Sequence, residues 1–305
     1  MRYAYAKLGG YDLIGMRLFG EGLGNMLFPW ARFVVQTRAF RLTPITPTWP
    51  QLKLGPWLRH ERDKRLYCGL FEPRQEEVRG SKKLRLLTFV RRADESSLRS
   101  DVPQNGDRIV VFEGVNGYFA GIAEEHDFVW EQLLRITRAQ HQTALTFSFA
   151  GSISVHVRLG DFRQAKSADD LVYGRGNMRL PLTWYRHVIE RIREHLGRLA
   201  PVFVFSDDHD AELRPLLQMP DTRRLSFGSS IGDLIALSRA NVLVASNSTF
   251  SMWASYLGRP PAIWHKGLLR QGFYGISTTN NRGVECGEFD EIPDGFWRHL
   301  PRAPG

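Results

Sequence analysis

The sequence predicts an α/β protein with a parallel sheet in its C-terminal half. Three observations lead to this class. Strand and helix signals alternate from residue 151 onward, the strand signals are short runs of β-branched and aromatic residues, and polar residues directly follow three of these strands. Strands that alternate with helices pair in parallel through right-handed crossovers. Such a sheet binds its ligands beyond the carboxyl ends of its strands.

The elements of the C-terminal half follow in chain order. We expect strands at 152–157, 201–205, 224–227, 242–245 and 261–264. Thr183 is expected to cap the first helix, and Gly197 is expected to end it. Ser230 and Asp233 have the spacing of a capping box at the start of a later helix, and Gly258 is expected to end the last one.

The N-terminal half has a less regular pattern. We expect strands at 13–19, 84–90 and 108–113, a helix through 28–34 and another at about 128–143. A glycine-rich turn at 20–25 separates the first strand from the first helix, where backbone N–H groups can approach an anion. It is not the dinucleotide-binding fingerprint, because Asn25 stands where the third glycine belongs, and a plain tight turn is the alternative interpretation.

Proline and glycine mark two further features of the chain. Residues 43–60 contain four prolines and two tryptophans, which predicts an irregular wall suited to a variable substrate. A Ser/Gly segment near 146–151 precedes the regular alternation. We therefore expect an N-terminal domain at 1–150 and a C-terminal domain at 151–305.

Composition limits the classes of function. The chain has 305 residues, a net charge of +9 and two cysteines, Cys68 and Cys286, without metal-ligand spacing. We see no signal sequence and no membrane-spanning run, and therefore expect a cytoplasmic protein with reduced thiols. The basic residues are scattered without the pattern of a nucleic-acid-binding module, so we expect no nucleic-acid partner. Peripheral contact with an anionic membrane surface, on the cytoplasmic face of an inner membrane, would also account for the charge.

Three polar clusters follow predicted strands, at 156–161, 206–210 and 246–251. His156 and Arg158 stand two residues apart and therefore face the same side of a strand. A guanidinium group that is always charged suits a phosphate or a carboxylate. Because the carboxyl ends of parallel strands share one edge, we expect the three clusters to converge on a ligand site. The alternative is that they are loop polar groups and helix caps.

Two other classes of enzyme have weaker support in the sequence than this ligand site. Asp208-His209-Asp210 has the Asp-x-Asp spacing with which metal-dependent glycosyltransferases hold a divalent ion. A nicotinamide oxidoreductase would need a glycine fingerprint after the first strand and an acidic residue after the second, and neither stands at that spacing.

Four segments of the chain resemble, in order, the motifs of the α-1,2-fucosyltransferases. They are Gly22–Phe28, His156–Asp161, Val204–Asp208 and Ser246–Leu257. These enzymes belong to a wider inverting superfamily that includes α-1,6- and protein O-fucosyltransferases. The resemblance implies a GT-B-like architecture, with two Rossmann-like domains facing a central cleft and the nucleotide sugar held mainly by the C-terminal domain.

The resemblance also implies a reaction. The protein is expected to move L-fucose from GDP-β-L-fucose to an acceptor oligosaccharide, with inversion and with no metal or other cofactor. An α-1,2 linkage to galactose in surface polysaccharide or glycolipid synthesis is the first expectation. An α-1,6 linkage and a non-catalytic nucleotide-sugar-binding protein are the alternatives. One departure from the family pattern bears on the linkage, because Leu159 replaces a second arginine that usually follows the first.

Residue roles follow from the matched motifs. Arg158 is expected to stabilise charge that grows on the β-phosphate, His156 to assist it, and Asp161, or else Glu21, to accept the acceptor proton. The alternative for Asp161 is that it holds Arg158 in place. The residues expected to bind GDP-fucose are Gly22, Gly24, Asn25, His156, Arg158, Ser206, Asp207, Asn247, Ser248, Thr249 and Phe250.

Overall fold

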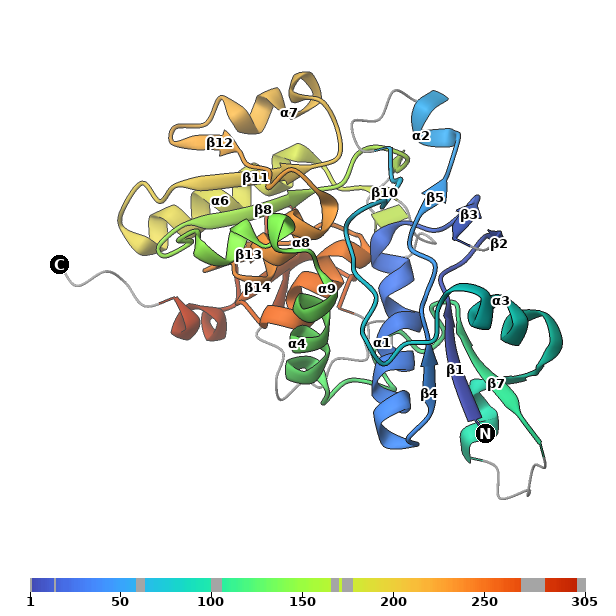
Figure 1. Cartoon of the computed structure of the whole chain (residues 1–305). Helices are drawn as coiled ribbons and strands as arrows, with labels where there is room; N and C mark the ends of the chain where they lie inside the picture. The colour runs from blue at the N-terminus through green and yellow to red at the C-terminus, as the bar shows by residue number, and fades with distance from the viewer. Residues whose placement is uncertain are drawn as a thin grey trace. The chain divides into compact units, whose positions relative to one another are not determined.

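The computed structural model describes residues 2–13, 15–58, 64–99, 106–165, 170–171, 178–269 and 283–300. The chain forms two compact units, one of Met1–Leu58 and Lys64–Ala139, the other mainly of Gln140–Gly305. The division between them follows Ala139, about ten residues before the domain boundary expected at 150–151. Each unit contains its own parallel sheet among the described residues (Figure 1).

Unit 1 is built on a sheet in the order β4-β1-β7-β6, with every described pairing parallel. Its elements are β1 (Arg2–Lys7), β2 (Tyr11–Leu13), β3 (Met16–Leu18), α1 (Leu23–Ala39), β4 (Thr43–Ile45), β5 (Gln51–Leu52), α2 (Gly55–Leu58), α3 (Gly80–Phe89), β6 (Arg91–Asp94), β7 (Arg108–Glu113) and α4 (His126–Ile136). A short 3₁₀ turn at Glu95–Arg99 lies between β6 and β7, and two more, at Ala139–His141 and Thr143–Thr146, follow α4 where the chain passes into unit 2.

The two faces of β1 carry side chains of different size. Tyr3 and Tyr5 join a core cluster with Leu86 of α3, whereas Ala4 and Ala6 are fully buried on the opposite face. Small alanine side chains leave room for α1, which packs on β1 and β7. Helices therefore cover both faces of this parallel sheet, as its burial requires.

Two predicted strands of unit 1 are wrong. Residues 84–90 belong largely to α3, because Lys83, Leu86 and Val90 turn toward the sheet at helical spacing. The strand expected at 13–19 is interrupted, because Gly15 has a φ of +109° and separates β2 from β3 in an antiparallel hairpin. The strand at 108–113 and the helix that follows the glycine-rich turn are confirmed.

Unit 2 is built on a parallel sheet in the order β12-β11-β8-β13-β14-β15 among the described strands (Figure 1). Its elements are β8 (Ile153–Val157), β9 (Arg163–Gln164), β10 (Met178–Arg179), α6 (Leu182–Leu196), β11 (Val202–Ser206), α7 (Asp210–Leu217), β12 (Thr222–Arg224), α8 (Ser230–Ser238), β13 (Leu243–Val244), α9 (Thr249–Gly258), β14 (Ala262–His265) and β15 (Gly283–Cys286). A 3₁₀ turn at Asp294–His299 follows. The predicted alternation of strands and helices is confirmed, although β12 lies two residues earlier than expected.

Helix ends in unit 2 agree only in part with the sequence signals. Gly197 ends α6 in the left-handed conformation, with φ at +63°, as expected. Thr183 does not cap this helix, because Pro181 stands at the N-cap and the Thr183 hydroxyl donates to Glu288 instead. Ser229, one residue before the expected position, caps α8 by accepting a hydrogen bond from the Gly232 amide.

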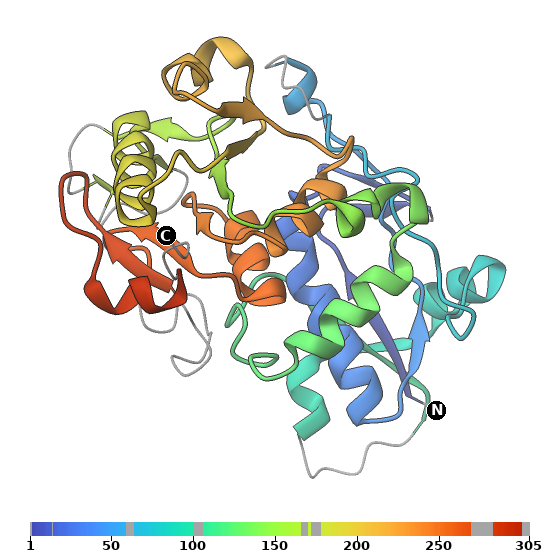
Figure 2. The same cartoon turned by 90° about the vertical axis from the view of Figure 1, so that its left-hand side faces the viewer.

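The strand order places a change of direction between β8 and β13. The chain runs from β8 outward to β11 and β12, and then crosses to β13, β14 and β15 on the other side of β8. Right-handed crossovers in opposite directions put their helices on opposite faces, and Figure 2 shows α6 and α9 on opposite sides of the strands. A change of direction of this kind opens a crevice at the carboxyl ends of the two central strands, where doubly wound proteins bind ligands.

Two further observations concern the whole described chain. Within the described ranges no helix has both the length and the apolar character needed to span a membrane. Cys68 and Cys286 are free thiols, and burial raises the pKa of Cys286 to about 11.

Candidate functional site

The three polar clusters of unit 2 begin at the same edge of the sheet. Ser206 of β11 pairs in register with Val157 of β8, and Val244 of β13 pairs with Val155. The loops that follow β8, β11 and β13 therefore start side by side. Side-chain contacts, described below, link β8 and the loop after it to each of the other two loops. The structure thus brings the clusters at 156–161, 206–210 and 246–251 together.

His156 joins β8 to the loop after β13. Its Nδ1 atom lies 2.7 Å from the Ser251 hydroxyl and 2.9 Å from the Ser246 hydroxyl. The Ser251 hydroxyl in turn accepts a hydrogen bond of 2.9 Å from the Ser246 amide. All three side chains are buried, so this network fixes the start of α9 against the end of β8. Ser246 and Ser251 lie in a predicted cluster but were not among the predicted site residues.

The imidazole of His156 is neutral at physiological pH. Burial, together with the nearby positive charge of Arg158, lowers the pKa of His156 from 6.5 to about 3. The ring lies 5.1 Å from the ring of Phe250, centroid to centroid. His156 can therefore orient neighbouring groups through hydrogen bonds, but it supplies no positive charge to a bound anion.

Arg158 is held between two carboxylates. Its Nη1 atom lies 2.7 Å from Asp207 Oδ2, and its Nη2 atom donates to Asp161 Oδ1. Asp207 Oδ1 also accepts a hydrogen bond of 3.1 Å from the Leu159 amide. Asp207 was expected to bind GDP-fucose, and in this structure it joins the loop after β8 to the loop after β11. The predicted alternative role of Asp161, holding Arg158, is present in the structure.

Gly160 makes the approach of Asp207 sterically feasible. A Cβ atom at this position would overlap the Asp207 carboxylate. Because the Gly160 φ is not in the left-handed region, the requirement comes from space and not from backbone conformation. The ion pair between Arg158 and Asp207 therefore requires a residue without a side chain at position 160.

Two arginines that sequence reasoning missed brace these loops. Arg179 of β10 donates through Nε to the Leu159 and Phe162 carbonyls, at 3.0 and 2.8 Å, and through Nη2 to the Gly160 carbonyl at 3.2 Å. Arg224 of β12 donates to the Ser206 carbonyl at 2.7 Å and to Asp210 at 2.5 Å. Arg179 follows an insertion without a recognisable motif, so no sequence signal pointed to it.

The amino-terminal turn of α9 faces the same edge. Ser248 is its N-cap and accepts a hydrogen bond of 3.4 Å from the Ser251 amide, while the Ser246 hydroxyl donates to Ser248. Asn247 precedes this cap, and Thr249 and Phe250 are the first residues of the helix. The positive end of the helix dipole and the first backbone N–H groups make this turn suitable for an anion.

The predicted residues of unit 1 lie at the start of α1. Gly22 is its N-cap, and the Gly22 carbonyl accepts hydrogen bonds from the Asn25 and Met26 amides at 3.0 and 3.1 Å. Gly24 stands in the first turn. The Asn25 side chain donates to Glu21 at 3.1 Å, so the second predicted base contacts a predicted ligand residue.

The Asp-x-Asp motif does not gather its carboxylates into one cluster. Asp208 Oδ1 accepts from the His209 amide at 2.7 Å, whereas Asp210 pairs with Arg224. Over the described residues, no group of three or more His, Cys, Asp and Glu side chains is arranged to hold a metal ion.

The segment of the chain that matches a known sequence family includes the loops at this edge of the sheet. Residues 115–263 match the model of glycosyl transferase family 11, and this segment contains the three loops that follow β8, β11 and β13. The match confirms the resemblance drawn from the motifs and the expectation that the chain is a glycosyltransferase. No curated protein matches the chain significantly.

Solved structures with a similar fold span both units. The chain is similar to NodZ α-1,6-fucosyltransferase co-crystallised with GDP, with a TM-score of 0.52 and 15% identity over 87% of this chain and 96% of that chain. For NodZ soaked with GDP-fucose the TM-score is 0.50 and the sequence identity is 16%, over 87% of this chain and 95% of that chain. For POFUT1 in complex with GDP-fucose the TM-score is 0.45 and the sequence identity is 15%, over 86% of this chain and 97% of that chain. The NodZ similarity confirms the GT-B-like α/β fold class.

Proposed function

We propose, from the premise that the chain is a glycosyltransferase related to family 11, that it transfers L-fucose from GDP-fucose to a hydroxyl group of an acceptor glycan. One observation carries the proposal. Arg158 stands at the carboxyl end of β8, where the strand order changes direction, inside the segment that matches the family model. This is where a doubly wound sheet binds a nucleotide.

The proposed donor site combines Arg158 with the first turn of α9. Departure of GDP leaves growing negative charge on the β-phosphate, and a charged guanidinium stabilises that charge more in the transition state than in the ground state. In our proposal Arg158 keeps Asp207 as its fixed partner and exchanges Asp161 for the phosphate, because the Asp161 side chain is the more exposed of the two, at 32% against 13%. The first N–H groups of α9 bind further phosphate oxygens.

The exchange would release Asp161 for a second role. The acceptor oxygen attacks C1 of fucose on the face opposite GDP, and the bond between C1 and the phosphate oxygen breaks with its electron pair on GDP. Asp161 accepts the proton of the acceptor hydroxyl. These steps invert the configuration of the anomeric carbon. In them, protein groups stabilise the charge on the departing GDP, and we propose that no metal ion is needed.

The linkage is proposed on the motifs alone. We propose α-1,2 transfer to galactose, in surface polysaccharide or glycolipid synthesis, because the four motifs resemble those of the α-1,2 enzymes. The alternative is α-1,6 transfer, the activity named for NodZ. Leu159 bears on this choice, since it leaves Arg158 without an arginine neighbour in sequence and is itself buried.

A calorimetric titration with GDP-fucose tests the proposed function. Arg158→Ala is expected to lose at least about 2 kcal/mol of binding, roughly thirtyfold in affinity, because a charged partner of the phosphates is removed. Arg186→Ala, which changes an exposed arginine on α6, is the matched control and is expected to bind as the wild type does. Equal affinities for wild type and Arg158→Ala would remove Arg158 from the donor site. Binding without transfer to any acceptor in a glycan screen would favour a non-catalytic binding protein.

We also propose that the protein works in the cytoplasm, against an anionic membrane leaflet. The net charge of +9 supports attraction to acidic lipids. Co-sedimentation with phosphatidylglycerol-containing liposomes is expected to weaken as salt rises, because the attraction is electrostatic. Co-sedimentation that is absent at low salt would contradict this location.

A further inference from the structure

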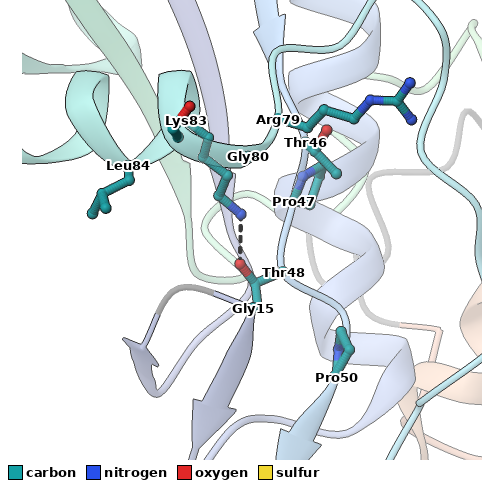
Figure 3. A pocket seen from close by; sticks show the side chains of 10 residues that line it. Gly15, Thr46, Pro47, Thr48, Pro50, Arg79, Gly80, Lys83 and Leu84 are labelled. Carbon is teal, nitrogen blue, oxygen red and sulfur yellow. Dashed lines mark hydrogen bonds between the residues drawn. The ribbon is translucent and has the colours of Figure 1, made fainter.

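Unit 1 contains a cavity of about 340 Å³ that the proposed donor site does not use (Figure 3). It lies beyond the carboxyl end of β4 and beside the first turn of α3, so it occupies the ligand-binding edge of a parallel sheet. The residues that line it are Gly15, Thr46, Pro47, Thr48, Pro50, Arg79, Gly80, Ser81, Lys83 and Leu84.

The side chain of Lys83 lies in this cavity and is buried, with 8% of its surface exposed. Its Nζ atom donates a hydrogen bond of 2.7 Å to the Thr48 hydroxyl, which Figure 3 shows as a dashed line. Thr48 in turn donates to Asp12 at 2.8 Å. In the described part of the chain no carboxylate lies within ion-pair distance of Nζ. Nζ also lies 5.4 Å from the centre of the Tyr5 ring. An ammonium group with one hydroxyl partner and one ring neighbour still has a donor for another acceptor.

The charges around Lys83 leave an excess of positive charge. Asp12 is the main acidic neighbour of both Lys83 and the buried Arg17, whose side chain donates hydrogen bonds to backbone carbonyls and to Met26. Glu77, the second acidic neighbour of Lys83, pairs with Arg74 at 2.9 Å. Burial lowers the pKa of Lys83, and the negative charges of Asp12 and Glu77 offset this only in part. An oxyanion in the cavity would add a further negative charge beside the ammonium group.

The remaining walls suit a sugar ring. Pro47, Pro50 and Leu84 present apolar faces, and Thr46 has a buried hydroxyl without a hydrogen-bond partner among the described residues. Ligand pockets commonly combine apolar walls with a few polar groups that set orientation. We propose that this pocket binds a sugar residue that carries a carboxylate or a phosphate, with the oxyanion at the Lys83 ammonium. The inference rests on the proposed function in one respect, since it takes this sugar to be part of the acceptor glycan.

Ligand-observed NMR on the full chain, without GDP-fucose, tests the pocket. Glucuronate and galactose 6-phosphate are expected to bind at least tenfold more tightly than neutral galactose. Inorganic phosphate is expected to displace glucuronate at least tenfold less effectively than galactose 6-phosphate does. Equal binding of galactose and glucuronate would overturn the proposal. Equal displacement by the two phosphates would show a simple anion site and overturn the assignment of a sugar.

Variants of α3 complete the test. Lys83→Met is expected to raise the Kd for glucuronate at least tenfold, whereas Lys82→Met, which changes the exposed lysine beside it, leaves the Kd unchanged. Leu84→Asp adds a negative charge at an exposed wall position and is expected to weaken glucuronate binding even if Lys83→Met fails to fold. Unchanged binding in Leu84→Asp, or in folded Lys83→Met, would overturn the proposal.

A parallel titration with GDP-fucose separates the two claims. Glucuronate binding without GDP-fucose binding would contradict the proposed function and leave the pocket in place. GDP-fucose binding without glucuronate binding would contradict the proposed pocket and leave the proposed function in place.

Discussion

The guanidinium of Arg158 and the carboxylate of Asp207 lie 2.7 Å apart and join the loops that follow β8 and β11. Asp161 contacts the same guanidinium from the other side. One cation therefore serves two carboxylates in this structure. The proposed reaction depends on which of the two carboxylates leaves the guanidinium when the diphosphate binds.

Asp161→Asn is expected to raise the affinity for GDP about threefold to tenfold, because the phosphate no longer competes with a carboxylate for Arg158. The same change is expected to reduce fucose transfer at least about 100-fold, since the proposed base is lost. Calorimetry with GDP and a transfer assay measure the two effects. Asp127→Asn, at an exposed position on α4, serves as the control. A drop in both GDP affinity and transfer would instead make Asp161 a structural support of Arg158.

Gly160→Ala is expected to weaken GDP-fucose binding at least about tenfold, because the new Cβ displaces Asp207 and with it Arg158. Gly121→Ala is the matched control, since its Cβ would make only an ordinary contact of 3.8 Å with Arg32. Titration of both variants with GDP-fucose provides the comparison. Wild-type affinity in Gly160→Ala would mean that the Asp207 contact is not needed for donor binding.

Arg179→Ala is expected to lower kcat and raise the KM for GDP-fucose, because three carbonyls of the loop after β8 lose their common donor. A combined loss of about tenfold or more in kcat/KM corresponds to about 1.4 kcal/mol of transition-state stabilisation. Arg179→Lys is expected to recover only part of this loss, since a single ammonium does not reproduce the planar guanidinium. Arg163→Ala, at an exposed arginine of β9, controls for charge. A change in thermal stability without a change in kcat or KM would limit Arg179 to a folding role.

His156 is expected to make stability depend on pH. Its pKa is about 3 in the folded protein and near 6.5 when unfolded, so the unfolded chain binds the extra proton between these values. The contribution of His156 is complete above pH 6.5 and is lost as the pH falls toward 3. Urea unfolding of wild type and His156→Asn from pH 7 to pH 4 measures it. The wild-type advantage should shrink by up to about 1.4 kcal/mol per pH unit, and parallel curves would contradict the account.

The C-terminal fold was readable because local signals and tertiary structure agree there. The strands β8, β11, β13 and β14 are short buried runs, and Gly197 ends α6 where a left-handed residue is needed. In unit 1 the apolar run at 84–90 predicted a strand, but Lys83 and Leu86 are buried at helical spacing and tertiary packing decided the outcome. The strand β1 was missed although Tyr3 and Tyr5 alternate with two alanines, which is a readable period-two pattern.

The location of the candidate site could be predicted from the sequence, but the contacts between its side chains could not. Parallel topology implies that the three clusters share one edge, and this follows from the order of elements alone. That Asp207 would pair with Arg158, or that Arg179 would brace the loop, depends on side-chain geometry that no spacing encodes. The neutral state of His156 likewise follows from its burial, which a sequence motif does not reveal.

A crystal structure of the protein with GDP tests the central claim most directly. The account predicts the β-phosphate within hydrogen-bond distance of the Arg158 guanidinium and beside the first turn of α9, with Asp161 displaced from the guanidinium and Asp207 still in contact. GDP bound away from the carboxyl ends of β8 and β13, with the contacts of Arg158 to both carboxylates intact, would contradict it.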